Sequence, residues 1–367
     1  MALHSLASSG LESGSDTLLY SNGFDVKILS TAKAIGQEAW DNLAKDQAFA
    51  SYRWYRFGET VLADDTPIYI LLSRHGETVA RATLWLTRQE PLPIPSKIGR
   101  YLLETLLRRW PLLLCRTPWW SGVSGLILPD PPLRYAALRT ITQVAWDQAQ
   151  HHQASFLVFD NLERDQMDWS GWPADFVPTT ISNQGTRLVI TWADFESYLR
   201  HLSRSMRKDY RRHRNRASDL GIRVGHHSKV TRLDEALKLI RNVERRHRSS
   251  PNPWARRVLQ NADMVDSTWL TAEIDGRLVG CGLLLGDEKT RFLTLLGLDY
   301  DVRYVYFQLI YEAIRCAIGE GVRVLRGGSG AYRVKERLGF GLEHNNYVAF
   351  TANNRVLRWA GQLLSTN

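Results

Sequence analysis

A repeated order of predicted elements constrains the fold more than any other feature of this sequence. In each half of the chain, helix-prone segments precede a β-hairpin, and a later helix leads into another strand. The hairpin turns are His75-Gly76-Glu77 and Asp275-Gly276-Arg277, and the pairs Arg134-Tyr135 and Arg303-Tyr304 introduce the later helices. This duplication predicts two α/β halves of similar plan, each with a mixed sheet, joined near residue 190.

The boundaries of these elements follow from periodicity. Helices are expected over residues 32–45, 54–62, 133–151, 194–220, 233–247 and 305–318. Strands are expected over residues 26–29, 68–73, 79–86, 156–159, 269–274, 278–285, 291–296 and 322–325. We therefore divide the chain into a disordered tail (1–23), a first half (24–190) with a Pro-, Trp- and Leu-rich insertion (88–131), and a second half (191–367).

The composition is that of a globular protein in a reducing compartment. Of the 367 residues, 44% are hydrophobic and 23% are charged. Cys115, Cys281 and Cys316 lie in apolar runs without metal-ligand spacing, which predicts buried thiols, a cytoplasmic location and no metal site. The start of the chain lacks the basic and apolar regions of a signal peptide. Residues 101–120 are interrupted by charges and proline, so they are expected to pack as core or to touch a membrane surface peripherally, not to span it.

The positive charge is concentrated in one predicted helix. The net charge is +9, and between residues 200 and 216 eight Arg and Lys face a single acid, Asp209. That segment carries +7 and leaves +2 for the remainder of the chain. An apolar stripe runs along the same helix through Phe195, Leu199, Leu202, Met206 and Tyr210. The cations are either a solvated face or a surface for the phosphates of a nucleotide cofactor, of RNA or of a lipid headgroup.

Residues 319–340 combine a short β-branched run, four small residues and a helix-prone segment. The small residues are Gly327-Gly328-Ser329-Gly330, and Tyr332 and Lys335 follow on one face of the predicted helix. A strand that enters a glycine-rich turn and then a helix leaves backbone N–H groups free for an anion or a developing oxyanion. The simpler alternative is a tight turn with no further role.

Several segments together resemble the FemAB-like branch of the GNAT acyltransferase superfamily, and in particular its BioF2-like acetyltransferase domain. They are, in order, Trp40-x-x-Leu43 with Phe49-x-Ser51-x-x-Trp54, the basic stretch LSRSMRKDYRRHRNRASDLGIRV, the hairpin AEIDGRLVGCGLLL and the closing stretch GEGVRVLRGGSGAYRVKERLGF. The resemblance covers residues 25–350 and implies a tandem GNAT-like fold that transfers an acyl group to a primary amine. The acceptor that it implies is a small molecule, a peptide, or a cell-wall or lipid precursor.

The resemblance implies an acyl-CoA as the donor, or an aminoacyl-tRNA as in the peptidoglycan-bridge members, and no metal. The candidates for binding the donor are Arg303, residues 327–330 and, on the basic helix, Arg207, Arg211 and Arg212. The sequence departs from the family at two positions. The usual pyrophosphate loop, Arg/Gln-x-x-Gly-x-Gly/Ala, should follow Leu298, but residues 299–307 contain no glycine, and Arg326 stands where many relatives carry an acid.

Acyl transfer to an amine needs an oxyanion site, a proton donor for the leaving group and an acceptor for the amine proton. Backbone N–H groups around Gly328 are the candidates for the oxyanion site, Tyr332 for the acid, and Lys335 for charge compensation. Asp299 or Glu273 could accept the proton, although carboxylates in such strands are more often paired structurally. Tyr332 could equally be a core aromatic residue, and Lys335 an ordinary surface lysine.

Three functions therefore remain open at the level of sequence. The first is an acyl-CoA-dependent N-acyltransferase. The second is an aminoacyl-tRNA-dependent transferase, which the basic helix and the missing loop glycines favour. The third is a non-catalytic module that binds RNA or membrane phosphates.

Overall fold

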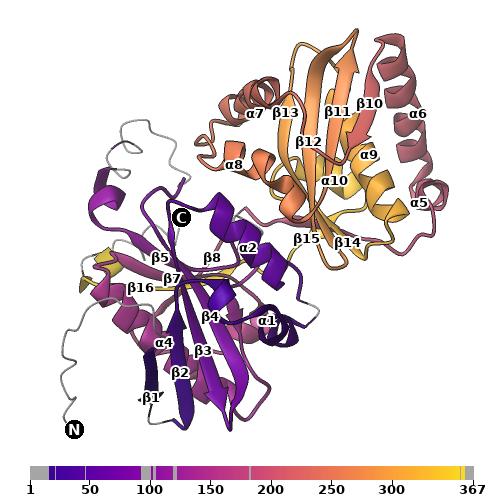
Figure 1. Ribbon diagram of the computed structural model, residues 1–367. Helices are drawn as coiled ribbons and strands as arrows, with labels where there is room; N and C mark the ends of the chain where they lie inside the picture. The colour runs from indigo at the N-terminus through magenta and orange to yellow at the C-terminus, as the bar shows by residue number, and fades with distance from the viewer. Residues whose placement is uncertain are drawn as a thin grey trace.

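The computed structural model describes residues 16–359, apart from residues 21, 46, 92–100, 102–104, 119–121, 182 and 356. Two sheets organise the chain (Figure 1). The first has the order β1-β2-β3-β4-β5-β7-β16-β8, with β6 paired to β4, and the second has the order β10-β11-β12-β13-β14-β9-β15. The strands of the first sheet are β1 Asp16–Tyr20, β2 Phe24–Leu29, β3 Thr66–Arg74, β4 Glu77–Thr87, β5 Leu112–Cys115, β6 Leu126–Ile127, β7 Phe156–Leu162, β8 Val177–Thr180 and β16 Tyr347–Ala352. Those of the second are β9 Thr186–Val189, β10 Arg223–His227, β11 Asp266–Ile274, β12 Arg277–Asp287, β13 Thr290–Leu298, β14 Val324–Arg326 and β15 Gly341–Leu342.

Helices pack on both faces of each sheet. They are α1 Gln37–Ala44, α2 Tyr52–Val61, α4 Arg134–His151, α5 Phe195–His201, α6 Arg204–Asp219, α7 Leu233–His247, α8 Ala255–Gln260, α9 Val305–Gly319 and α10 Tyr332–Arg337, with short 3-10 turns at η1 Ala32–Ala34, η2 Arg164–Met167, η3 Trp169–Gly171 and η4 Ala262–Met264. Helix α4 covers one face of the first sheet, and α5, α6 and α9 cover one face of the second. Side chains of α1, α2, α7 and α8 form a shared core with the remaining faces of both sheets. The two halves are therefore joined by buried apolar surface, which is the main source of stability in such an interface.

The strand pairing confirms the predicted duplication. In each half a hairpin (β3–β4 or β11–β12) is followed by an antiparallel neighbour (β5 or β13) and then by a parallel one (β7 or β14). The two hairpin turns share a backbone conformation, because both central residues of each turn have positive φ: His75 and Gly76 in the first, Asp275 and Gly276 in the second. Two consecutive residues with positive φ match the right-handed twist of the flanking strands.

The sheets exchange strands across the boundary that the sequence predicts near residue 190. Strand β16 belongs to the C-terminal segment but lies between β7 and β8 of the first sheet. Strand β9 comes before residue 190 but lies between β14 and β15 of the second sheet. A division of the chain at one residue therefore does not separate the two sheets.

Two predicted helices are each divided by the structure. The helix expected over residues 32–45 consists of η1 and α1, interrupted at Ile35 and Gly36. The helix expected over residues 194–220 is broken at Leu202, whose ψ of 152° is extended, and the Ser203 side chain then caps α6 by accepting from the N–H of Met206. The apolar stripe is still buried on both pieces, because the break keeps the two helices on the same core. Periodicity reports the buried face and does not detect a local cap.

Two other expectations about the first half are corrected. The predicted disordered tail is wrong over residues 16–20, where the apolar run Leu18-Leu19-Tyr20 belongs to β1, an edge strand paired with β2. Residues 1–15 lie outside the described part of the chain. The predicted insertion 88–131 contains β5, a fully buried central strand whose four consecutive apolar residues suit a site covered on both faces. Among the described residues, no helix has both the length and the apolar character needed to cross a bilayer.

Candidate active site

The glycine-rich turn after β14 is organised by a buried lysine. The side-chain ammonium of Lys335 lies 2.6, 3.0 and 3.3 Å from the carbonyl oxygens of Gly327, Gly328 and Ser329. Lys335 is only 4% exposed, so the alternative of an ordinary surface lysine is wrong. Helix α10 places Lys335 above the turn, and the turn is fixed on its other side by Thr186 of β9, whose hydroxyl donates to the Gly328 carbonyl at 2.7 Å.

This arrangement points three backbone N–H groups away from the lysine. The C=O and N–H of one trans peptide point in opposite directions, so carbonyls that converge on Lys335 turn the N–H groups of Gly328, Ser329 and Gly330 outward. In the part of the chain that the structure describes, none of these N–H groups donates a hydrogen bond. We call these three groups the glycine nest. Successive free N–H groups of this kind form a concave site for an anion or an oxyanion.

Gly328 and Tyr332 contribute to the nest in different ways. Gly328 has a φ of +64°, which an L side chain rarely adopts, although an added Cβ would meet only the Phe292 ring at 3.5 Å. Substitution there would therefore strain the backbone without causing a clash. The hydroxyl of Tyr332, at the first position of α10, donates to the carbonyl of Gln184 at 2.8 Å. Tyr332 is half-buried next to the nest, so a role limited to core packing does not describe it fully.

Strand β13 runs past the nest without a partner on that side. Strand β14 pairs with β13 only at residues 290–292; among the described residues, 293–298 still pair with β12 but have no strand on the side of β14, whose chain turns into the nest. Leu295, in this unpaired part, has a φ of 45°, and the register of β13 against β12 shifts at the same place. Bulges of this kind redirect backbone groups next to active sites. The backbone groups of β13 on the side of β14 are therefore left without a strand partner beyond Phe292 in the described part of the chain.

A cavity of about 560 Å³ lies next to β14, the strand whose chain continues into the nest. Its lining comes from both halves and includes Asn161 of β7, Glu163 just after β7, Arg187 of β9, and His344 and Asn345 from the segment after β15. At its floor lies the buried ion pair between Arg326 and Glu343, in which the guanidinium donates to both carboxylate oxygens. Arg326 also donates to the Gly122 carbonyl at 2.8 Å, which ties the cavity to the first half.

The Arg326–Glu343 pair explains one departure from the resembled family. Arg326 occupies the strand position where many relatives carry an acid, and Glu343, from the segment after β15, returns a carboxylate to that place. Breaking such a pair on one side leaves an uncompensated buried charge, which costs about 3–5 kcal/mol. Glu343 was not a candidate in the sequence, because nothing in the local pattern of residues 341–346 signals its distant partner.

The two predicted general bases lie away from the nest. Asp299 accepts from Arg277 at 2.8 Å, and Glu273 lies 3.5 Å from Arg232, so both carboxylates are in ion pairs near the β11–β12 hairpin turn. Asp299 follows the far end of β13, seven residues beyond Phe292, which places it roughly 20 Å along the strand from the nest. Because both carboxylates are in ion pairs and lie far from the nest, neither is positioned to take a proton from an amine bound at the nest.

The loop before α9 contains none of the usual glycines, yet one of its residues adopts a backbone conformation that glycine favours. Tyr304 occupies the N-cap position of α9 and has a φ of +72°, but its side chain makes no capping hydrogen bond. Arg303 is exposed beside it. The second half of α6 lies along the first turns of α9, where His213 stacks on Phe307 at 3.8 Å. The cations of α6 therefore lie on the same side of the second half as this loop.

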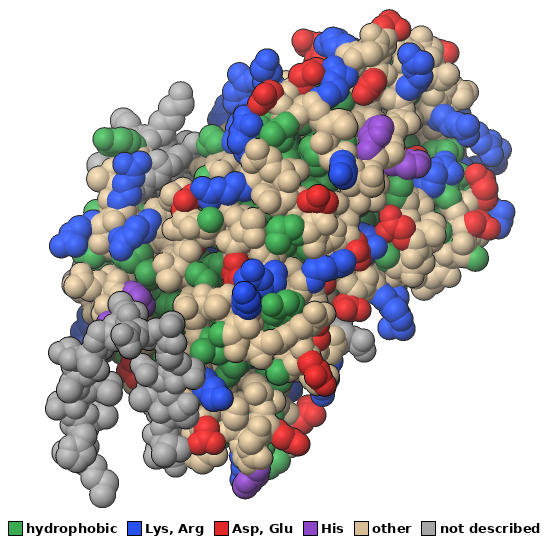
Figure 2. All heavy atoms as spheres, viewed as in Figure 1, with side chains coloured by type: hydrophobic (Ala, Val, Ile, Leu, Met, Phe, Trp, Pro, Cys, Tyr) green, Lys and Arg blue, Asp and Glu red, His purple; other side chains and the backbone are tan. Residues whose placement is uncertain are grey.

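The structure separates the predicted phosphate-binding arginines. Arg207 donates to the carbonyls of Arg200 and Leu202 and so caps α5, and Arg212 pairs with Asp209 at 2.8 Å. Arg211 is exposed and has no partner among the described residues. Arg204 and Lys208 share its face of α6 and are likewise exposed without a described partner. Figure 2 shows Lys and Arg side chains along the edge of the molecule where Figure 1 places α6.

A larger hollow of about 820 Å³ lies over α7 and the segment that leads to α8. It is a shallow surface lined by charged side chains, and its ion pairs Arg241–Glu244 and Arg256–Asp234 are already formed. Several of its charged side chains therefore already have partners, whereas the N–H groups of the glycine nest have none among the described residues. We therefore place the candidate active site at the nest and the adjoining cavity.

Comparison with known proteins identifies a family for part of the second half. Residues 204–336 match the family model described as an acetyltransferase (GNAT) domain, a range that includes β13, the loop before α9 and the nest. No curated protein sequence matches the chain significantly.

Similar solved structures cover nearly the whole chain. A structure of FemX has a TM-score of 0.62 at 12% identity and covers 94% of this chain and 99% of its own. A tandem GNAT protein from the clavulanic acid biosynthesis pathway has a TM-score of 0.56 at 13% identity, covering 90% and 99%. The C-terminal domain of a putative lysylphosphatidylglycerol synthetase from Agrobacterium fabrum has a TM-score of 0.54 at 12% identity, covering 90% and 94%. At these identities the likeness concerns the fold.

Proposed function

Because the chain carries an acetyltransferase (GNAT) domain within a tandem GNAT-like fold, we propose that it transfers an acyl group from an acyl-CoA to a primary amine. The observation that carries this proposal is the glycine nest. Three outward N–H groups, held by Lys335, lie beside the unpaired part of β13 in the matched domain. Such preorganised donors stabilise an oxyanion without reorganisation during the reaction.

The proposed reaction uses the groups around the nest. The neutral amine attacks the thioester carbonyl, a C–N bond forms, and the oxygen that becomes negative accepts from the N–H groups of Gly328 and Gly330. Collapse of this intermediate breaks the C–S bond, and Tyr332 donates its phenolic proton to the leaving thiolate. The proton released by the attacking nitrogen returns through solvent to Tyr332. The products are an amide and free CoA.

The adjoining cavity is the proposed site of the acceptor. Its polar lining and the exposed carboxylate of Glu163 suit a ligand that carries an amine, and its opening to solvent suits a small molecule, a peptide or a cell-wall or lipid precursor. Exposed apolar side chains at Tyr101, Leu106 and Trp110 of the first half support peripheral contact of a cytoplasmic protein with a lipid surface. Arg326 lines the cavity and immediately precedes the glycine-rich turn in the chain, which supports a meeting of donor and acceptor at this end of β14.

A second donor class is favoured by the unpaired cations of α6. Arg204, Lys208 and Arg211 form an exposed basic face, and the loop before α9 lacks the glycines of a standard pyrophosphate site. Both observations suit an aminoacyl-tRNA, whose backbone would occupy a longer basic surface than CoA does. A non-catalytic RNA- or membrane-binding module would use the same cations and leave the nest without a role.

The test compares donors and then removes the proposed acid. CoA thioesters of increasing chain length should raise the melting temperature by mass action, and transfer to an amine should be visible by mass spectrometry. Tyr332→Phe should keep the fold and lower turnover by about two to four orders of magnitude, the usual effect of losing a general acid. Tyr300→Phe, an exposed tyrosine at the other end of β13, is the matched control.

The outcomes distinguish the alternatives. Stabilisation by aminoacyl-tRNA and by no thioester would replace acyl-CoA as the donor and keep the transferase. Full turnover in Tyr332→Phe would exclude Tyr332 as the acid. Binding of RNA or anionic vesicles, with no transfer from either donor, would establish the non-catalytic module.

A further inference from the structure

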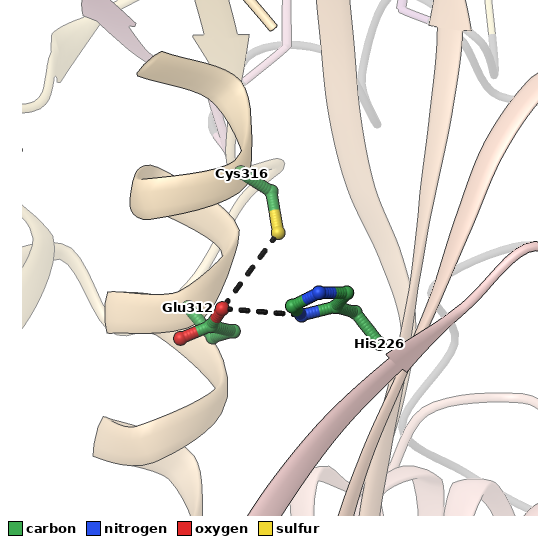
Figure 3. Close-up of side chains that lie close together, drawn as sticks. All are labelled: His226, Glu312 and Cys316. Atoms are coloured by element: carbon green, nitrogen blue, oxygen red, sulfur yellow. Dashed lines mark hydrogen bonds and ion pairs between the residues drawn. The ribbon is translucent and has the colours of Figure 1, made fainter. Parts of the chain in front are cut away.

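A histidine, a glutamate and a cysteine converge on the face of the second sheet that α9 covers. His226 belongs to β10, and Glu312 and Cys316 are one helical turn apart on α9 (Figure 3). The His226 Nδ1 atom lies 3.4 Å from Glu312 Oε1, and the Cys316 Sγ atom lies 3.9 Å from the same oxygen. All three ligand atoms lie within 4.8 Å of one another.

These separations are close to those that a tetrahedral zinc ion imposes on its ligands. Zinc bonds of about 2.0–2.3 Å at tetrahedral angles place neighbouring ligand atoms about 3.3–3.6 Å apart. The 3.4 Å between His226 and Glu312 already matches this spacing, the 3.9 Å between Cys316 and Glu312 is slightly longer, and the His226–Cys316 pair, within 4.8 Å, can shorten by side-chain rotation when an ion binds. A thiolate, an imidazole and a carboxylate are also the three ligand types that zinc uses in proteins.

A neighbouring arginine fixes the orientation of the carboxylate. The Arg315 Nε atom lies 3.4 Å from Glu312 Oε2, which leaves Oε1 directed at His226 and Cys316. Arg315 is itself held by the ring of Phe195, at 4.1 Å, and by the hydroxyl of Tyr210, at 3.4 Å. Partners that orient a ligating carboxylate in this way support metal affinity.

The site is accessible and distinct from the candidate active site. The His226 side chain is 64% exposed and that of Glu312 is 19% exposed, so an ion could enter from solvent and keep a water molecule. Strand β10 is at the edge of the second sheet, four strands from β14, and thus roughly 19 Å from the strand that leads into the glycine nest. Figure 2 shows histidine side chains at the surface where Figure 1 places β10.

We propose that His226, Glu312 and Cys316 bind a zinc ion, with water at the fourth position. The ion would join the edge strand β10 to α9. An edge strand that a metal ion holds against a helix is less available for pairing with other chains. The sequence carries only a weak signal for this site, because His226 is 86 and 90 residues from its partners and no short motif links them.

Cobalt is the probe for the test, because a thiolate bound to Co²⁺ gives a charge-transfer absorption in the near ultraviolet. The full-length protein, freed of metal by a chelator, is titrated with Co²⁺ and then with Zn²⁺. We expect the thiolate band to appear and Zn²⁺ to abolish it by displacement. Zn²⁺ should also raise the melting temperature, because it binds only the folded site.

Variants assign the ligands. Cys316→Ser should remove the band, and His226→Gln and Glu312→Gln should weaken Co²⁺ binding by at least about tenfold, while Arg315→Gln should weaken it by roughly 10–100-fold. His227→Gln is the matched control, because its ring lies 3.3 Å from Thr271 and outside the trio. Circular dichroism establishes that each variant is folded.

Two results would overturn the proposal. The first is a wild-type protein that shows neither the thiolate band nor a zinc-dependent melting temperature, which would make the trio a hydrogen-bonded cluster only. The second is a band that persists in Cys316→Ser, which would assign the thiolate to another cysteine.

Discussion

Lys335 illustrates how a single side chain can shape a backbone site. Burial lowers the pKa of its ammonium to about 8, against an opposing effect of the Glu343 carboxylate. The group is therefore charged at neutral pH while it holds three carbonyls and turns the N–H groups of the nest outward. The sequence indicated the residues of this site but assigned Lys335 to charge compensation, since a contact with carbonyls six to eight residues away has no sequence signal.

The first prediction at this scale concerns pH. Donor binding should weaken as the pH rises through about 8, because Lys335 loses the charge that orders the nest. The free energy of unfolding should instead increase with pH over the same range. The folded chain binds fewer protons than the unfolded chain between about pH 8 and 10.5, so this group's contribution to stability increases with pH over that window. Donor titrations and melting temperatures measured in the same buffers separate the two effects.

Lys335→Arg provides the control for this titration, because a guanidinium keeps its charge over the whole range. If the variant folds, its donor affinity should be independent of pH near 8. Wild-type affinity that stays constant through pH 9, with a stable fold, would contradict the role of the Lys335 charge.

At the level of elements, α6 separates what periodicity can predict from what it cannot. The buried stripe of Phe195, Leu199, Met206 and Tyr210 was predicted correctly, because spacing alone determines the apolar face. The break at Leu202 was not, and it changes the role of Arg207 from a phosphate ligand to a cap on α5. Which cations remain free depends on such local partners, so it could be known only from the structure.

The prediction for α6 uses the cations that the structure leaves unpaired. Replacing Arg204, Lys208 and Arg211 by Glu should weaken donor binding, by about 1.5–3 kcal/mol for each charge-assisted contact that is lost. The melting temperature should change little, because these side chains are exposed. Binding to the wild type should also weaken with added salt, and more steeply for a tRNA donor than for an acyl-CoA.

An equal change of charge elsewhere is the control. Lys27, Lys33 and Arg74 are exposed in the first half, and their replacement by Glu should leave donor binding unchanged. Equal losses in the two triple variants would attribute the effect to net charge and would leave α6 as a solvated face.

At the scale of the whole molecule, local pattern predicts the repeated parts and misses the parts that join them. Both hairpins, helices α4, α7 and α9 and the tandem plan were predicted within a few residues. Strands β8, β9, β15 and β16 were missed. They are two to six residues long, and their partners are remote in sequence, as in the pairing of Tyr347 with Leu162. A sequence window contains no information about such a pairing.

The prediction at this scale concerns β16. A chain that ends at residue 346 should lose hydrogen-exchange protection in β7 and β8, because β16 lies between them. A chain that ends at residue 352 keeps β16 and should retain that protection. If β7 and β8 remain as protected from hydrogen exchange in the chain of 346 residues as in the full protein, β16 does not stabilise them and the prediction is wrong.

The strand exchange also has a consequence for synthesis. Strand β7 leaves the ribosome long before β16, which must enter between β7 and β8, so the first sheet cannot close while the second half is being translated. At bacterial or eukaryotic elongation speeds this interval lasts about 10–40 s, during which an edge of β7 remains open to other chains. We therefore expect a chaperone to bind the nascent chain at the unpaired edge of β7. Translation pauses late in the message would prolong the time for which this edge is exposed.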